Sequence, residues 1–323
     1  MENPEPKPQD FGGPDESPLR SRQDVVCVGV DGSRAARQAV LWGAVEARLR
    51  HAQLLIVHVA LVATDNLGAE SSDISGEALL VSSAKAATEL EPDVDVRTNL
   101  VTGTSVRAEL VGLSERAAVL ALGIDLTRRR AAYGALGPIE DYVAVHAGCP
   151  VVTVAPGSFV APGARTHVTV GWTEGHAARL ALDAAAEEAH LRGAVLSIVT
   201  VPPVRDPQLE GIVPAPDQES ALIEAVSDVE GRYPGLPVDI THETGDVTAA
   251  LRATAPRSEL LVLGCHHSTK SWSIWTGPVA EDLIRAGHCP VMLVGRRARH
   301  RAERPTSRPA TGQTDPSSSQ ARR

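Results

Sequence analysis

The chain has 323 residues, of which 43% are hydrophobic, 22% are charged and only 3% are aromatic, and its formal net charge is −9. This length suits two domains of roughly 130 to 150 residues each. No run of about 18 apolar residues is present, which argues against a membrane-spanning helix and a membrane partner. The start of the chain lacks the basic and then apolar pattern of a signal peptide, so we expect a cytoplasmic protein.

Charge is unevenly distributed along the chain. Residues 296–323 contain eight arginines against two acidic residues, so the rest of the chain is more acidic than the total suggests. An acidic surface repels nucleic acid, and so few aromatic residues cannot build base-stacking platforms. We therefore expect no nucleic-acid partner, while phosphate, a membrane or an acidic protein remain alternatives as targets of the basic tail.

The four cysteines stand apart from one another, each in or beside an apolar stretch, at Cys27, Cys149, Cys265 and Cys289. No Cys-x-x-Cys spacing is present, which argues against a zinc or redox site. We interpret them as reduced packing residues.

The first part of the chain alternates between predicted strands and helices. An apolar strand starting at Val25 ends in Gly-Val-Asp-Gly-Ser and leads directly into a helical pattern. The remaining strands are expected at 53–60, 94–100, 118–123 and 149–155, and the helices at 33–51, 77–91, 105–114 and 138–147. Strands that alternate with helices predict a parallel sheet with helices on both faces.

The pattern then repeats with a constant spacing. A separation of 142 positions relates Gly29 to Gly171, Arg37 to Arg179, Arg50 to Arg192 and Val59 to Val201. We therefore predict a disordered tail over 1–23, a domain over 24–156, a linker over 157–165, a second domain over 166–295 and a disordered basic tail over 296–323. The last strands, Val151–Val154 and Val291–Val294, are apolar edges, so we expect them to pair across the domain interface, in a molecule that forms homo-oligomers.

Three motifs carry a resemblance to a known family. They are the strand that ends in Gly-Val-Asp-Gly-Ser, the fourth strand that ends in a glycine ahead of a second glycine and a helix, and the final Cys-Pro-Val strand. Each half resembles a universal stress protein domain, and the whole chain resembles the tandem form of that family. The resemblance implies two flavodoxin-like (Rossmann-like) α/β domains, each a five-stranded parallel sheet with strand order 3-2-1-4-5, packed as a pseudo-dimer.

The resemblance also implies a crevice for an adenine nucleotide such as ATP, with nucleotide-bound magnesium as its only metal. Glycines let the backbone wrap phosphates, and the free amides at the following helix start hold the anion. The aspartate after the first strand faces the ribose and metal, and the adenine lies by the end of the second strand. The positions that match are Gly29, Asp31, Val59, Gly123 and Gly137 in the first half, and Gly171, Thr173, Val201, Gly264 and Gly277 in the second.

Neither half has the full nucleotide motif of the family. Leu126 and His267 stand where the family has its second loop glycine, and Pro138 and Pro278 replace the hydroxyl residue that follows the third. Each proline removes one amide that a phosphate would use, and Thr173 replaces the aspartate. Lost hydrogen bonds to a charged group, worth roughly 1.5 to 3 kcal/mol each, weaken binding. We therefore expect weak or absent ATP binding.

Several other side chains have two interpretations. Arg128, Arg129 and Arg130 could clamp an anion or lie on a solvated loop, and Trp272 and Trp275 could fill the phosphate region or pack over their loop. His266 and His267 fit packing better than a metal site, because no carboxylate follows at ligand spacing. His146 and His288 end predicted helices, where a positive charge suits the helix dipole, so we interpret both as caps.

No Ser-His-Asp arrangement, carboxylate pair or Walker motif is visible, so we expect no enzyme. The first hypothesis is a non-catalytic regulatory or binding module of a stress response. One alternative is an ATP-binding stress sensor or slow ATPase that retains nucleotide in at least one domain. The other is an interaction scaffold whose pockets are filled by side chains.

Overall fold

The computed structural model describes residues 25–61, 74–125, 137–160, 163–173, 175–201, 218–265 and 277–298. The predicted tail 1–23 lies outside the described residues, as does all but the first three residues of the tail 296–323. Disorder in both tails therefore stays a prediction. Within the described residues, no helix has both the length and the apolar character needed to cross a bilayer.

The first half of the chain forms the five strands and four helices that the sequence predicts. They are β1 (Val25–Gly29), α1 (Arg34–Arg50), β2 (Gln53–Leu61), α2 (Ile74–Leu90), β3 (Val96–Gly103), α3 (Val106–Ser114), β4 (Val119–Gly123), α4 (Pro138–His146) and β5 (Val151–Val154). The third strand runs later than the predicted 94–100, because the Val94 amide donates to the Glu91 carbonyl and forms a turn there. The fifth strand is shorter than expected and starts after Pro150, which has no amide to donate.

The second half repeats this order of elements. They are β6 (His167–Trp172), α5 (His176–Arg192), β7 (Val195–Thr200), α6 (Gln218–Arg232), β8 (Val238–His242), α7 (Val247–Thr254), a 3-10 turn (Ala255–Arg257), β9 (Ser258–Gly264), α8 (Pro278–Ala286) and β10 (Val291–Val294). Helices α1 and α5 have the same length of 17 residues and end in the same way, at the left-handed residues His51 and Gly193.

The ten strands form one continuous sheet, in the order β3-β2-β1-β4-β5-β10-β9-β6-β7-β8. Each half keeps the predicted order 3-2-1-4-5, and all pairs within a half are parallel. The expectation of two five-stranded sheets needs a correction, because β5 and β10 pair with each other and join the halves into a single sheet.

The pairing of the last strands across the interface is confirmed. β5 and β10 run antiparallel, with Val152 opposite Met292, and the Thr153 hydroxyl donates to the Val291 carbonyl over 3.1 Å. All four residues of each strand are buried. Buried strands with open edges would leave backbone donors and acceptors without partners, so the two edges satisfy each other within one chain. Homo-oligomerisation stays a prediction.

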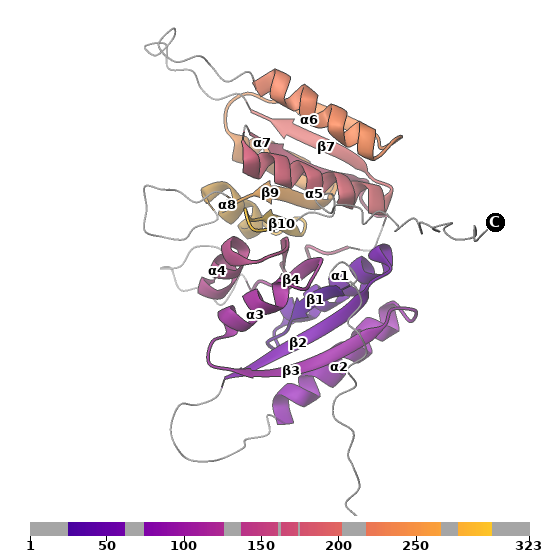
Figure 1. The fold of residues 1–323 in the computed structure, drawn as a ribbon, viewed down its shortest axis with the longest axis vertical. Coiled ribbons are helices and arrows are strands. Elements are labelled where there is room, and N and C mark those ends of the chain that lie inside the picture. The colour runs from indigo at the N-terminus through magenta and orange to yellow at the C-terminus, as the bar shows by residue number, and fades with distance from the viewer. Residues whose placement is uncertain are drawn as a thin grey trace, which may run out of the picture.

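The helices cover both faces of the sheet, and the N-terminal and C-terminal halves stack along the long axis of the molecule (Figure 1). Helices α1, α2, α5 and α6 pack on one face in a single apolar cluster that extends across the junction from Val152 and Val154 to Met292 and Val294. On the other face, Ala144 of α4 packs in one cluster with Leu283 of α8. The halves therefore share a core, as a pseudo-dimer in one chain.

Candidate functional site

In each half the carboxyl ends of the strands lie next to the start of the helix that follows the fourth strand, and we call this region the crevice of that half. Parallel α/β sheets bind ligands in this place, where the strand order reverses between the first and fourth strands. In the first half, β1 and β4 lead to this edge and α4 begins beside it. In the second half, β6 and β9 lead to it and α8 begins beside it.

The turn after β1 is closed by its own side chains. The Ser33 amide donates to Asp31 Oδ1 over 2.9 Å, and Ser33 Oγ accepts from the Ala36 amide over 3.0 Å, which caps α1. Gly32 has a φ of +80°, which a glycine adopts without strain. Asp31 is exposed at the crevice, as the predicted nucleotide site requires.

Four of the predicted glycines have a packing role that needs no ligand. A Cβ on Gly123 would lie 2.2 Å from the Ala35 carbonyl carbon, and a Cβ on Gly264 would lie 2.5 Å from the Ala177 carbonyl oxygen. These glycines let β4 and β9 pass close to the first turns of α1 and α5. A Cβ on Gly29 or Gly171 would instead meet leucine side chains, at 2.8 and 3.1 Å.

The predicted adenine positions lie by the ends of the second strands. Val59 is half-buried in β2 and packs against the core cluster formed by α3 and α4. Val201 directly follows β7 and is also half-buried. Their role beside an adenine stays a prediction.

An internal carboxylate occupies the start of α4. Gly137 is the N-cap of this helix, and a Cβ on it would lie 2.4 Å from Glu140 Oε2. The backbone amides of Gly137 and Glu140 hydrogen-bond to this carboxylate, which is the side-chain half of a capping box. Burial raises the pKa of Glu140 above its usual value, and the nearby charges of Asp31 and Asp141 raise it further, while the two amides lower it.

The second crevice lacks these acidic groups. Ala280 stands at the position of Glu140, and the exposed Thr173 stands at that of Asp31. Among the described residues, no side chain caps the start of α8 at Gly277, which has a φ of +98°, or the start of α5 at Gly175. Glu281 lies one position further along α8 and pairs with Arg285 over 2.5 Å. The start of α8 therefore has no carboxylate at the position of Glu140.

The two prolines lie at the helix starts, as the sequence predicts. Pro138 and Pro278 are the first residues of α4 and α8, so each helix start has one amide fewer for an anion. The other loop positions of the sequence analysis lie outside the described residues: Leu126, Arg128, Arg129, Arg130, His266, His267, Trp272 and Trp275.

The cysteines and one of the two cap histidines behave as predicted. All four cysteines are free and buried, and burial raises the pKa of Cys27, Cys265 and Cys289 to about 12. His146 Nδ1 lies 2.8 Å from the Tyr142 carbonyl oxygen in the last turn of α4. Within the described part of the chain, no group of three His, Cys, Asp or Glu side chains could hold a metal ion.

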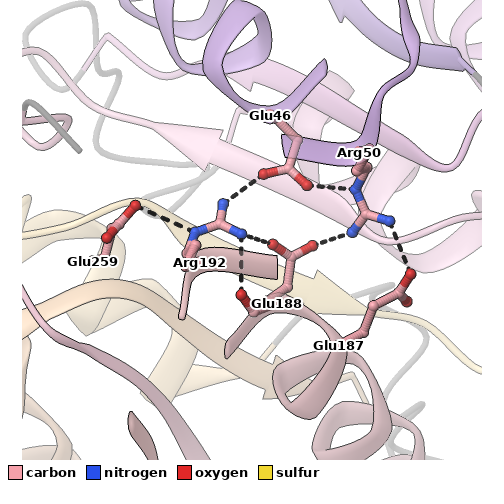
Figure 2. A network of polar contacts seen from close by, with 6 residues as sticks. All are labelled: Glu46, Arg50, Glu187, Glu188, Arg192 and Glu259. Carbon is pink, nitrogen blue, oxygen red and sulfur yellow. Dashed lines mark hydrogen bonds and ion pairs between the residues drawn. The ribbon is translucent and has the colours of Figure 1, made fainter. Parts of the chain in front are cut away.

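A buried charge cluster, which the sequence analysis missed, lies between the ends of α1 and α5. It consists of Glu46 and Arg50 from α1 and Glu188 and Arg192 from α5 (Figure 2). Arg50 and Arg192 each pair with both glutamates. The separation of 142 positions that relates Arg50 to Arg192 also relates Glu46 to Glu188. The repeated Glu-Arg pair within an alanine-rich helix was the sequence signal that could have predicted this cluster.

Comparison with known proteins gives one family. The model of the "Universal stress protein family" matches residues 24–155 and 165–295. Universal stress protein Rv2005c of Mycobacterium tuberculosis is 29% identical over 289 residues, which cover 84% of this chain and 97% of that protein. A solved universal stress protein from Archaeoglobus fulgidus has a TM-score of 0.62 at 17% identity and covers 85% of this chain and 98% of its own.

Some solved members of that family contain nucleotides. One from Archaeoglobus fulgidus is in complex with dAMP and another universal stress protein is in complex with cAMP, and they cover 41% and 42% of this chain. Their TM-scores are 0.33 and 0.35. Any statement about nucleotides in this chain has to come from its own residues.

Proposed function

Because this chain belongs to the universal stress protein family, we propose that it is a non-catalytic regulatory or binding module of a stress response whose first crevice holds no nucleotide. Glu140 carries this proposal. Its carboxylate takes the amides at the start of α4 that a phosphate would need. An ATP phosphate would have to displace this carboxylate and then lie beside Asp31 and Asp141, whose charges act on the same place.

The second crevice supports the alternative of weak adenine-nucleotide binding in one half. Thr173 and Ala280 remove two negative charges from this place, and the start of α8 has no side-chain cap among the described residues. Pro278 still removes one amide, and no aspartate is present for the metal side of a magnesium nucleotide. Any ATP that binds should therefore be held weakly, in the second half alone.

The direct test is native mass spectrometry of the purified full chain, followed by calorimetry with magnesium ATP. We expect no co-purified nucleotide and, at most, one weak site per chain. Measurement of phosphate release should show no turnover above the rate without protein. Tight binding of two ATP molecules per chain, or ATP hydrolysis with multiple turnovers, would overturn the proposal.

Two substitutions test which half of the chain binds ATP. Ala280→Glu puts a carboxylate at the start of α8 and should abolish ATP binding, whereas Glu140→Gln should leave it unchanged, because Pro138 and the remaining acids still disfavour the first crevice. Glu281→Gln is the matched control on α8, since this neighbouring side chain in the first turn pairs with Arg285 and should leave ATP binding nearly unchanged. Altered ATP binding in Glu140→Gln with normal binding in Ala280→Glu would place the nucleotide in the first half and contradict the assignment.

A further inference from the structure

The charge cluster connects the two halves at the point where α1 and α5 meet. Arg50 of the first half pairs with Glu188 of the second, and Arg192 of the second half pairs with Glu46 of the first. Each arginine also pairs with the glutamate four residues before it in its own helix. The two glutamates are fully buried, and Arg50 and Arg192 are only 10% and 3% exposed. The cluster is a symmetric crosslink between the halves.

Two further carboxylates bring the described contacts of this cluster to more acidic than basic groups. Glu187 of α5 lies 3.1 Å from Arg50, and Glu259 of β9 lies 3.4 Å from Arg192, at opposite ends of the cluster (Figure 2). Four carboxylates therefore face two guanidinium groups. An uncompensated charge in a buried place is costly, and binding a proton is the simplest way for a carboxylate to lose it.

Among the other charged groups that the structure describes here, Arg165 offsets part of the charge of Glu259 and the rest interact elsewhere. Arg165 of the linker acts on Glu259 from outside, and its guanidinium donates to the carbonyls of Ser158 and Ser258. Arg48 of α1 pairs with Glu91, at the end of α2, and His190 of α5 packs against the Tyr233 ring. None of these groups is paired with Glu46 or Glu188 among the described contacts.

We infer that the charge cluster is a proton-responsive lock between the two halves, which binds one proton when it is closed and weakens when that proton is lost. Glu188 is the residue where the proton is most favoured. Burial raises its pKa from 4.5 to about 7, helped by the charges of Glu46 and Glu187 and opposed by the two arginines. Arg192 and Arg50 instead lower the pKa of Glu46, so the pair divides into one neutral and one charged carboxyl.

The direction of the pH effect follows from these two shifts. Glu188 has a raised pKa in the folded state, so the stability that its proton gives is full below 4.5 and is lost as the pH rises to about 7. Within this window Glu46 is ionised in both the folded and the unfolded chain, because its folded pKa is lowered, and it adds no slope. One proton changes the ratio of folded to unfolded chains by up to about tenfold per pH unit.

The test compares urea unfolding of the full chain and of Glu188→Gln from about pH 5 to pH 8. Glutamine is the uncharged counterpart of the protonated side chain, so the variant should match the wild type at the acidic end. The ratio of variant to wild-type stability constants should then rise by up to about tenfold per pH unit and level off above pH 7. Glu89→Gln, in an exposed pair with Lys85, is the matched control and should keep the wild-type slope.

Two additional measurements keep the inference testable. Amide hydrogen exchange in β5 and β10 should show a junction that loses protection with rising pH in the wild type but not in Glu188→Gln. If that variant does not fold, Glu187→Gln, which removes a partly exposed charge that raises the pKa of Glu188, should shift the upper end of the pH window downward. A wild-type pH slope in Glu188→Gln, or an unchanged window in Glu187→Gln, would overturn the inference.

Discussion

The two crevices of this chain have the same order of strands and helices but differ in the charge of their side chains. The first presents Asp31 at the end of β1 and holds the Glu140 carboxylate at the start of α4, whereas the second has Thr173 and Ala280 at these positions. Both begin their helix with proline after glycine. The difference shows that a duplicated scaffold can keep its order of strands and helices while the side chains at two positions change the charge beside a helix start.

At the ends of α1 and α5, by contrast, the two halves have the same charged residues. Arg50→Ala and Arg192→Ala should each destabilise the protein by about 3 to 5 kcal/mol, because each leaves the buried Glu46 and Glu188 without one of their two arginines. The double variant should cost less than the sum, since both arginines serve the same two carboxylates.

Urea unfolding measures these three variants. Arg285→Ala, which removes an exposed pair within α8, is the control and should cost no more than about 0.5 kcal/mol. Strictly additive losses from Arg50→Ala and Arg192→Ala would show that the two halves do not share one cluster.

The strand-end glycines should be equally sensitive in the two halves. Gly123→Ala and Gly264→Ala should each cost about 1 to 3 kcal/mol, because the added methyl group meets backbone atoms of α1 or α5 that cannot rotate away. Gly112→Ala is the opposite control: it lies in α3 with open space around it and should stabilise the protein by about 0.5 to 1 kcal/mol. Thermal unfolding of the three variants without nucleotide distinguishes a packing role from a ligand role. If Gly123 and Gly264 served only to bind phosphate, their substitution would not lower the stability of the ligand-free protein.

The helix starts should differ between the halves. Ser33→Ala removes the hydroxyl that accepts from the Ala36 amide and should cost about 1 kcal/mol, whereas Ser33→Gly should cost only a few tenths. Helix α5 begins at Gly175, whose φ of +117° favours glycine, so Gly175→Ser should destabilise it by about 1 to 3 kcal/mol instead of supplying a cap. A stabilised Gly175→Ser variant in thermal unfolding would mean that both helices start alike.

The smallest expected effect comes from the charge of Glu140. Its pKa is raised in the folded state, so the stability linked to its proton is present below its ordinary pKa and is lost as the pH rises through the folded value. Glu140→Gln keeps the hydrogen bond to the helix start but not the charge. It should match the wild type in acid and be more stable at neutral pH by less than about 1 kcal/mol. A variant that is less stable at neutral pH would show that the amides at the start of α4 outweigh burial and the neighbouring acids.

The sequence by itself determined the duplication and the order of strands and helices. Apolar runs and glycine-rich strand ends are local signals. The Cys-Pro-Val strands have the pattern of edges that need a partner, which predicted the pairing of Val151–Val154 with Val291–Val294 across the interface. The packing role of the cysteines followed from their apolar surroundings in the same way.

Only the tertiary structure determined which strands and side chains from distant parts of the sequence meet. The two predicted sheets form one sheet, because β5 and β10 hydrogen-bond to each other at the edges of the two halves. The tertiary structure also brought Glu140 back onto Gly137 beside Asp31, and it placed Glu46 against Arg192, 146 positions away. Charges that are distant in sequence meet only when helices pack, so their mutual pKa shifts and the chemistry of both regions depend on the folded arrangement.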